Sequence, residues 1–274
     1  MAPAVVDFID GDGAISDDSD FYGNEPDNRP ELEAYIGYAD RLPYNIAYRA
    51  GTKLALAPGE RLHNPLEGDK SAWQLNETID IFLKRLPPST ALNIGPWIWM
   101  PNPRSPPKAQ EPDNDAFIDA GDRLLANFLA ENGGKAPTGR GVKAKVQKLE
   151  SELKQTAKRY NVASGKWMLF PSEGQVDRVW KTVCDAMLRS NLGNMAKVAT
   201  KDETKDGRLV CIYTYDFENE ADVKRVCTQL KLLGLIPDKG IYYKADAWTL
   251  LDLGSKNDYG IKASIYGSRD MLKG

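Results

Sequence analysis

The sequence predicts an α+β fold in which helices pack on one face of a mostly antiparallel sheet. From residue 165 onward, strand-like and helix-like segments follow in the order strand, helix, strand, strand, helix, strand. The polar turn between the two adjacent strands contains Asp206-Gly207, a pair that favours a β-hairpin. Both helices end at Leu-Gly, at 192–193 and 233–234, so a strand can follow each helix after a short turn.

A separate group of segments precedes this region. Short strands are expected at 44–48 and 53–57. Ser71 and Gln74 have the spacing of a capping box, which predicts a helix that continues to Leu86 and ends at Pro87-Pro88.

Residues 95–100 predict the next strand. Because side chains alternate along a strand, Trp97 and Trp99 are expected on the same face. The following stretch, 101–112, holds five prolines and is predicted to be a loop.

Two further helices are expected between this loop and residue 164. The first has apolar residues on one face from Phe117 to Leu129 and ends at Gly133-Gly134. The second, 142–160, is highly charged and has only a thin apolar stripe, which predicts a peripheral helix.

The elements after residue 164 are the most regular. A capping box of Ser172 and Gln175 begins one helix, and Asn219 caps the other. The predicted strands are 166–170, 195–200, 209–217, 241–251 and 261–266.

Charge divides the chain into a tail and a body. Residues 1–33 contain ten acidic residues and one basic residue, a net charge of −9. Since the whole chain carries −3, the remainder carries +6. We therefore predict a disordered acidic tail over 1–33, one domain over 34–268 with a proline-rich and basic helical insertion at about 101–163, and a C-terminal tail over 269–274.

Several classes of function have no signal in the sequence. Three cysteines and one histidine, His63, without close grouping predict neither a disulfide framework nor a metal site. The patterns of a phosphate-binding loop and of a dinucleotide-binding fingerprint are both missing, and no cofactor is expected. No apolar run is long enough to cross a membrane and the N-terminus lacks a secretory pattern, so a cytoplasmic or nuclear location is expected.

The candidate binding residues are polar or aromatic side chains within the predicted strands. Lysines interrupt three of these strands, at Lys166, Lys197 and Lys244. The accompanying candidates are Trp97, Trp99, Trp167, Tyr213 and Asp216. On one concave face, lysines would meet phosphate groups and aromatic rings would stack on bases. The alternative is an ordinary solvated sheet face, on which lysine and tyrosine are common.

Five motifs resemble a family of uncharacterised proteins named for a basophilic leukemia-expressed member, the Bles-type family. They are Gly165-Lys166-Trp167-Met168-Leu169-Phe170, Val176-Asp177-Arg178-Val179-Trp180, Ala196-Lys197-Val198-Ala199-Thr200, the run from Cys211 to Phe217, and Tyr243-Lys244-Ala245-Asp246. Upstream, Gly95-Pro96-Trp97-Ile98-Trp99 also looks like this family.

The resemblance implies a curved sheet backed by helices, similar to the fold of the mRNA cap-binding translation initiation factor. By analogy it implies a non-enzymatic protein that binds RNA or a phosphorylated, cap-like nucleotide. A shared fold does not transfer function. A protein–protein interaction scaffold and a small-molecule enzyme built on Asp216 and Asp246 therefore stay open.

Overall fold

One open antiparallel sheet organises the part of the chain that the computed structural model describes, which is residues 61–92, 94–134, 139, 141–202 and 207–273. Its strands lie in the order β1-β3-β4-β2-β5-β6. They are β1 (Trp97–Pro101), β2 (Gly165–Leu169), β3 (Met195–Ala199), β4 (Val210–Thr214), β5 (Tyr242–Ala245) and β6 (Tyr266–Gly267). The predicted α+β class is confirmed.

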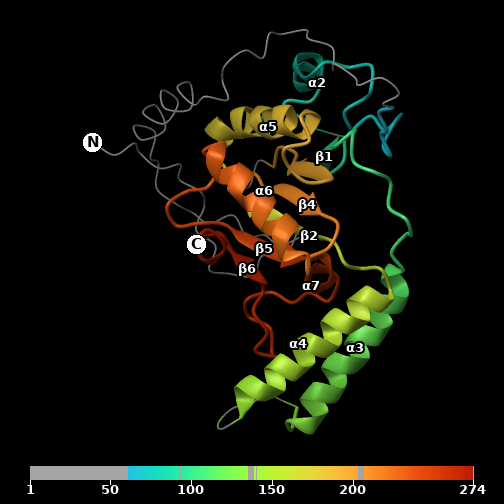
Figure 1. The fold of residues 1–274 in the computed structure, drawn as a ribbon, viewed down its shortest axis with the longest axis vertical. Coiled ribbons are helices and arrows are strands. Elements are labelled where there is room, and N and C mark those ends of the chain that lie inside the picture. Colours follow the sequence, from blue (N-terminus) through green and yellow to red (C-terminus); the bar gives the residue numbers. More distant parts are fainter. Residues whose placement is uncertain (1–60, 93, 135–138, 140, 203–206, 274) are drawn as a thin grey trace.

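The main hydrophobic core lies between one face of this sheet and helices α5 (Glu173–Leu188) and α6 (Glu220–Leu232), which are on the same side of the sheet in Figure 1. Trp167 of β2 and Trp180 of α5 are fully buried in it. The Trp167 Nε1–H donates to the carbonyl oxygen of Val223 in α6 at 3.1 Å, which ties the sheet to that helix.

The capping signals at the start of these two helices are confirmed, whereas α5 ends at Leu188, before the stop predicted at 192–193. The Gln175 side chain accepts a hydrogen bond from the backbone N–H of Ser172 at 3.4 Å, as a capping box requires. Asn219 accepts from the backbone N–H of Asp222 at 3.2 Å at the start of α6. Both caps satisfy N–H groups that have no partner within the helix.

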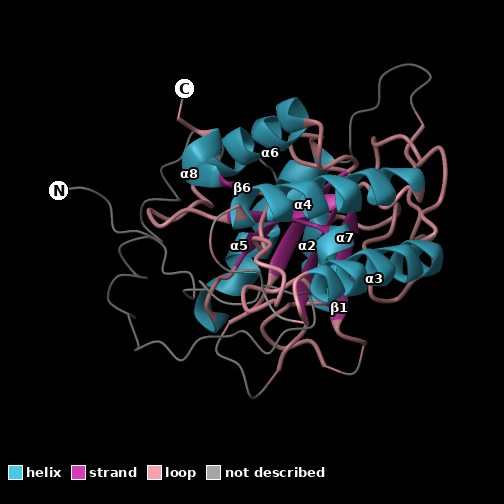
Figure 2. Ribbon diagram, turned by 90° about the horizontal axis from the view of Figure 1, so that it is seen from below, coloured by secondary structure: helices cyan, strands magenta, loops and turns pink. Residues whose placement is uncertain are grey.

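The segment 101–163 contains a helical hairpin of α3 (Asn114–Glu131) and α4 (Val142–Arg159). The two helices run side by side and extend away from the sheet (Figures 1 and 2). Gly133 and Gly134 follow α3 with φ values of 72° and 74°, which only glycine adopts at little cost. The predicted stop is thus confirmed, and α4 forms with only Leu149, Leu153 and Ala157 buried.

The capping box expected at Ser71 and Gln74 is wrong. Helix α2 spans Ile79–Arg85 and is capped by Thr78, whose side chain accepts from the backbone N–H of Ile81. Ala72 instead forms a parallel bridge with Trp99, and the Gln74 amide donates to carbonyl groups of the preceding loop. Pairing with the edge of the sheet outweighs the local helical pattern.

The predicted strand 241–251 is too long. β5 ends at Ala245 because α7 (Asp246–Leu250) begins there, and the backbone N–H of Asp246 donates to the carbonyl of Ser164 at 2.9 Å. β6 is also shorter than the strand predicted at 261–266. It is followed by α8 (Ser268–Met271), where the sequence predicted a tail.

A short helix, α7, contacts the sheet in addition to α5 and α6. α7 continues directly from β5, and its Thr249 bonds Lys166 on the face opposite α5 and α6. The predictions for 1–33, 44–48 and 53–57 lie outside the described residues.

Candidate ligand-binding face

The strand register places the three strand lysines on one face of the sheet. Residues directly opposite each other in an antiparallel pair share a face. Lys166 lies opposite Tyr213 on one side and opposite Lys244 on the other. Lys197 lies opposite Trp99, and Trp97 shares the face of Trp99 by alternation. We call these six residues, Trp97, Trp99, Lys166, Lys197, Tyr213 and Lys244, the lysine face.

Lys197 lies within a group of aromatic rings. Its ammonium nitrogen is 3.7 Å from the ring centroid of Trp97 and 5.3 Å from that of Trp99. The Tyr213 ring is 5.8 Å away. Only 5% of Lys197 is exposed, so the negative faces of these rings contribute to holding its charge away from water.

Lys166 is fully buried and ion-paired. Its ammonium lies 3.0 Å from Oδ1 of Asp246 and donates to the Thr249 hydroxyl at 3.0 Å. The other carboxylate oxygen of Asp246 accepts a hydrogen bond from the Ser164 hydroxyl. Asp246 is therefore fixed from two sides while 23% of its side chain remains exposed.

Lys244 is also fully buried and stands directly opposite Lys166. Like charges on directly opposed strand positions repel each other. The carboxylate of Asp246 offsets part of this repulsion, since it contacts Lys166. The lysine face therefore concentrates positive charge in the middle of the sheet.

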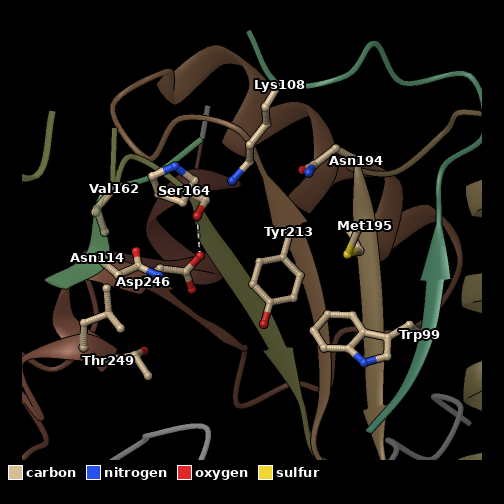
Figure 3. A pocket seen from close by; sticks show the side chains of 12 residues that line it. Trp99, Lys108, Asn114, Val162, Ser164, Asn194, Met195, Tyr213, Asp246 and Thr249 are labelled. Carbon is tan, nitrogen blue, oxygen red and sulfur yellow. Dashed lines mark hydrogen bonds between the residues drawn. The ribbon is translucent and has the colours of Figure 1, made fainter. Parts of the chain in front are cut away.

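A pocket of about 330 Å³ adjoins the lysine face and shares two of its residues, Trp99 and Tyr213. Figure 3 shows these rings along one side of the pocket, with Asp246 and Ser164 opposite. Lys108 and Asn194 lie at its upper end in the same view. Aromatic, cationic and hydrogen-bonding groups thus surround one cavity.

Two of the lining residues each have a polar side-chain atom without a partner among the described residues. The Oδ1 atom of Asn194 is shielded from solvent and accepts no hydrogen bond among the described residues. Lys108 is exposed, and it forms neither a hydrogen bond nor an ion pair within the described part of the chain. Buried polar atoms are normally satisfied, so an unsatisfied acceptor beside a cavity indicates where a ligand or water would bind.

The loop that carries Lys108 is held to the sheet by Tyr215. The Tyr215 hydroxyl donates to the carbonyl of Pro106, two residues before Lys108. Burial raises the pKa of Tyr215, which keeps the hydroxyl protonated as a donor. This contact positions Lys108 above the pocket although the loop has no regular structure of its own.

Two predicted site residues lie elsewhere. Trp167 is in the core on the opposite face of the sheet. Asp216 lies in the turn before α6, where it accepts from the backbone N–H of Glu218 at 2.8 Å, and it does not line the pocket. Sequence reasoning missed Lys108, Ser164 and Asn194 as site residues, because each lies outside a regular strand and only the tertiary structure brings them to the pocket.

The described residues lack two further kinds of feature. No group of three or more His, Cys, Asp or Glu side chains there is arranged to hold a metal ion. Within the same residues, none of the helices has the length and apolar character needed to cross a membrane.

Part of the chain matches a known protein family. Residues 28–252 match the family model described as basophilic leukemia-expressed protein Bles03. The match includes both the lysine face and the pocket.

Proposed function

We propose that this chain, which belongs to the basophilic leukemia-expressed protein Bles03 family, is a non-enzymatic protein that binds RNA or a phosphorylated nucleotide at the lysine face and its pocket. The observation that carries the proposal is the shared position of Trp99 and Tyr213. Their ring centroids lie 5.3 and 5.8 Å from the Lys197 ammonium, and both residues also line the pocket.

The aromatic side chains supply the surface for a base. Trp99 and Tyr213 line the pocket along one side, and both remain partly exposed. Stacking of a base on an aromatic ring contributes about 1–3 kcal/mol and tolerates different bases. The pocket volume of about 330 Å³ suits one nucleotide rather than a longer stretch of chain.

The cations supply the contact for phosphate. Lys108 is exposed at the end of the pocket and has no described ion pair, so a phosphate group would not have to displace a protein carboxylate there. Lys166 is different, because Asp246 already neutralises it. We therefore assign the direct phosphate contact to Lys108 and a longer-range attraction to Lys197 and Lys244.

A cap-like nucleotide is the ligand we propose to test first. The open antiparallel sheet with α5 and α6 on one face is compatible with a fold similar to that of the cap-binding initiation factor. This likeness remains a proposal, as does a cytoplasmic or nuclear location.

Calorimetric titration of the full chain with nucleoside monophosphates, cap analogues and a short RNA tests the proposal. Trp99→Ala and Lys108→Gln should each weaken binding, and Lys108→Gln should also reduce the salt dependence by roughly 0.7–0.9 in the log–log slope. Lys148→Gln is the matched control, since Lys148 lies on α4 with 78% of its side chain exposed. Binding of no member of the panel, or equal binding by all variants, would contradict the proposal. If this chain binds no nucleotide and a second protein co-purifies with it in stoichiometric amount, the protein–protein interaction scaffold is favoured instead.

A further inference from the structure

A second cavity, of about 660 Å³, lies between the first turns of α4 and the segment 260–265. We call it the α4 groove. None of the pocket residues discussed above lines it. Its function is therefore separable from that of the lysine face.

The apolar part of the α4 groove comes from the stripe on α4. Leu149, Leu153 and Ala157 in this stripe are buried, whereas Val142 and Val146 are only half-buried and line the groove. A Cβ added at Gly260 would lie 3.4 Å from the Cγ2 atom of Val146, an ordinary van der Waals contact, so the two residues adjoin each other in the groove. Part of the apolar stripe on α4 is therefore left uncovered by the other described residues and faces the groove.

The charged part of the groove is predominantly positive. Lys143, Lys154 and Lys262 line it together with a single acid, Glu150. None of the three lysines forms an ion pair with a described residue. The groove thus combines apolar lining residues with a net positive charge, which suits an acidic segment that carries large apolar side chains.

We propose that the α4 groove binds residues 17–22 of this same chain, Asp-Asp-Ser-Asp-Phe-Tyr, which we call the acidic segment. Its three aspartates are equal in number and opposite in charge to the three lysines of the groove. Phe21 and Tyr22 supply apolar side chains for the surface around Val142 and Val146.

The connecting chain is long enough for this contact. Residues 23–60 join the acidic segment to the described body and span on the order of 120 Å when extended. A domain of this length is roughly 50 Å across. Tethering also gives the segment a high effective concentration near the groove, so individually weak charge and apolar contacts suffice.

A spin label on the acidic segment tests the proposal in the full chain. Ser19→Cys provides one reactive thiol, because Cys184, Cys211 and Cys227 are all buried. The label should selectively broaden the amide signals of residues 142–147, and an excess of unlabelled peptide spanning 14–25 should restore them. No selective broadening, or equal restoration by a scrambled peptide, would overturn the proposal.

Charge exchange provides the second test. Lys143→Glu/Lys262→Glu in the labelled chain should abolish the broadening, and combining it with Asp17→Lys/Asp18→Lys should restore it. The control is Lys148→Glu/Lys256→Glu, which changes the charge equally but outside the groove. Loss of broadening in the control, or its persistence in the groove variant, would show a non-specific attraction and contradict the proposal. Nucleotide binding at the lysine face is measured separately, so failure here leaves that function untouched.

Discussion

Lys166 and Asp246 form an ion pair of 3.0 Å in which the lysine is fully buried and the carboxylate borders the pocket. The pair joins β2 to the start of α7, two elements that are far apart in the sequence. Asp246 therefore has both a structural partner and a position from which it can meet a ligand.

We expect Asp246→Asn to lower the free energy of unfolding by about 2–4 kcal/mol, because it leaves the buried Lys166 charge without its carboxylate. Urea unfolding followed by circular dichroism measures the change. Asp270→Asn is the control, since Asp270 pairs with Lys273 on the surface with 82% of its side chain exposed. It should have little effect, and an equal effect of the two substitutions would contradict the expected role of Asp246.

Gly193→Ala should be strongly destabilising. A Cβ at this position would lie 1.7 Å from the carbonyl oxygen of Tyr213, so the backbone of β4 would have to shift. We expect a loss of about 3 kcal/mol or more in thermal or urea unfolding. Gly174→Ala, in the first turn of α5 with no atom within 4 Å of the added Cβ, should instead be neutral or slightly stabilising. A neutral Gly193→Ala would refute the close approach.

Stability should depend on pH through Asp185. Burial raises the pKa of this carboxyl group, although Lys181 opposes the shift. Because the native pKa lies above the unfolded one, the native state holds its proton more tightly, and this contribution to stability is lost as pH rises through the native pKa. Asp185→Asn should remove this loss of stability with rising pH. Unfolding curves of both proteins, recorded from pH 4 to pH 7, measure the difference. Parallel curves for the two proteins would contradict the prediction.

Amide hydrogens of α4 should exchange faster than those of α5. Three residues of α4 are buried, compared with nine of α5, so opening α4 exposes less apolar surface. Hydrogen exchange read by mass spectrometry compares peptides from 142–159 with peptides from 173–188. Equal protection would mean that α4 unfolds only together with the core.

Local sequence signals were reliable wherever local chemistry decides the structure. Gln175 and Asn219 begin α5 and α6 as their capping patterns predicted, and Gly133 and Gly134 end α3. The alternation that places Trp97 and Trp99 on one face also holds, since it follows from strand geometry alone. These features need no knowledge of the neighbouring elements.

Two predictions about secondary structure were wrong because contacts with distant residues compete with the local sequence pattern. Gln74 has the right spacing for a capping box, yet its amide satisfies loop carbonyls because Ala72 pairs with the edge strand. At Asp246, a β-like run turns into helix α7, whose Asp246 and Thr249 side chains bind Lys166 of β2. In both places the structure is decided by a contact between residues that are far apart in the sequence. A local sequence pattern does not reveal such a contact.

The sequence by itself determined the α+β class, the main helices, and the presence of lysines and aromatic residues within strands, because these follow from side-chain periodicity and capping chemistry. Only the tertiary structure decided that Trp167 faces the core while Lys197 faces the aromatic rings of the lysine face. The order β1-β3-β4-β2-β5-β6 fixes this, since it makes neighbours of strands that are distant in the chain. The pocket formed with Lys108 and Asn194 has the same origin, because loop positions depend on long-range contacts such as that of Tyr215 with Pro106.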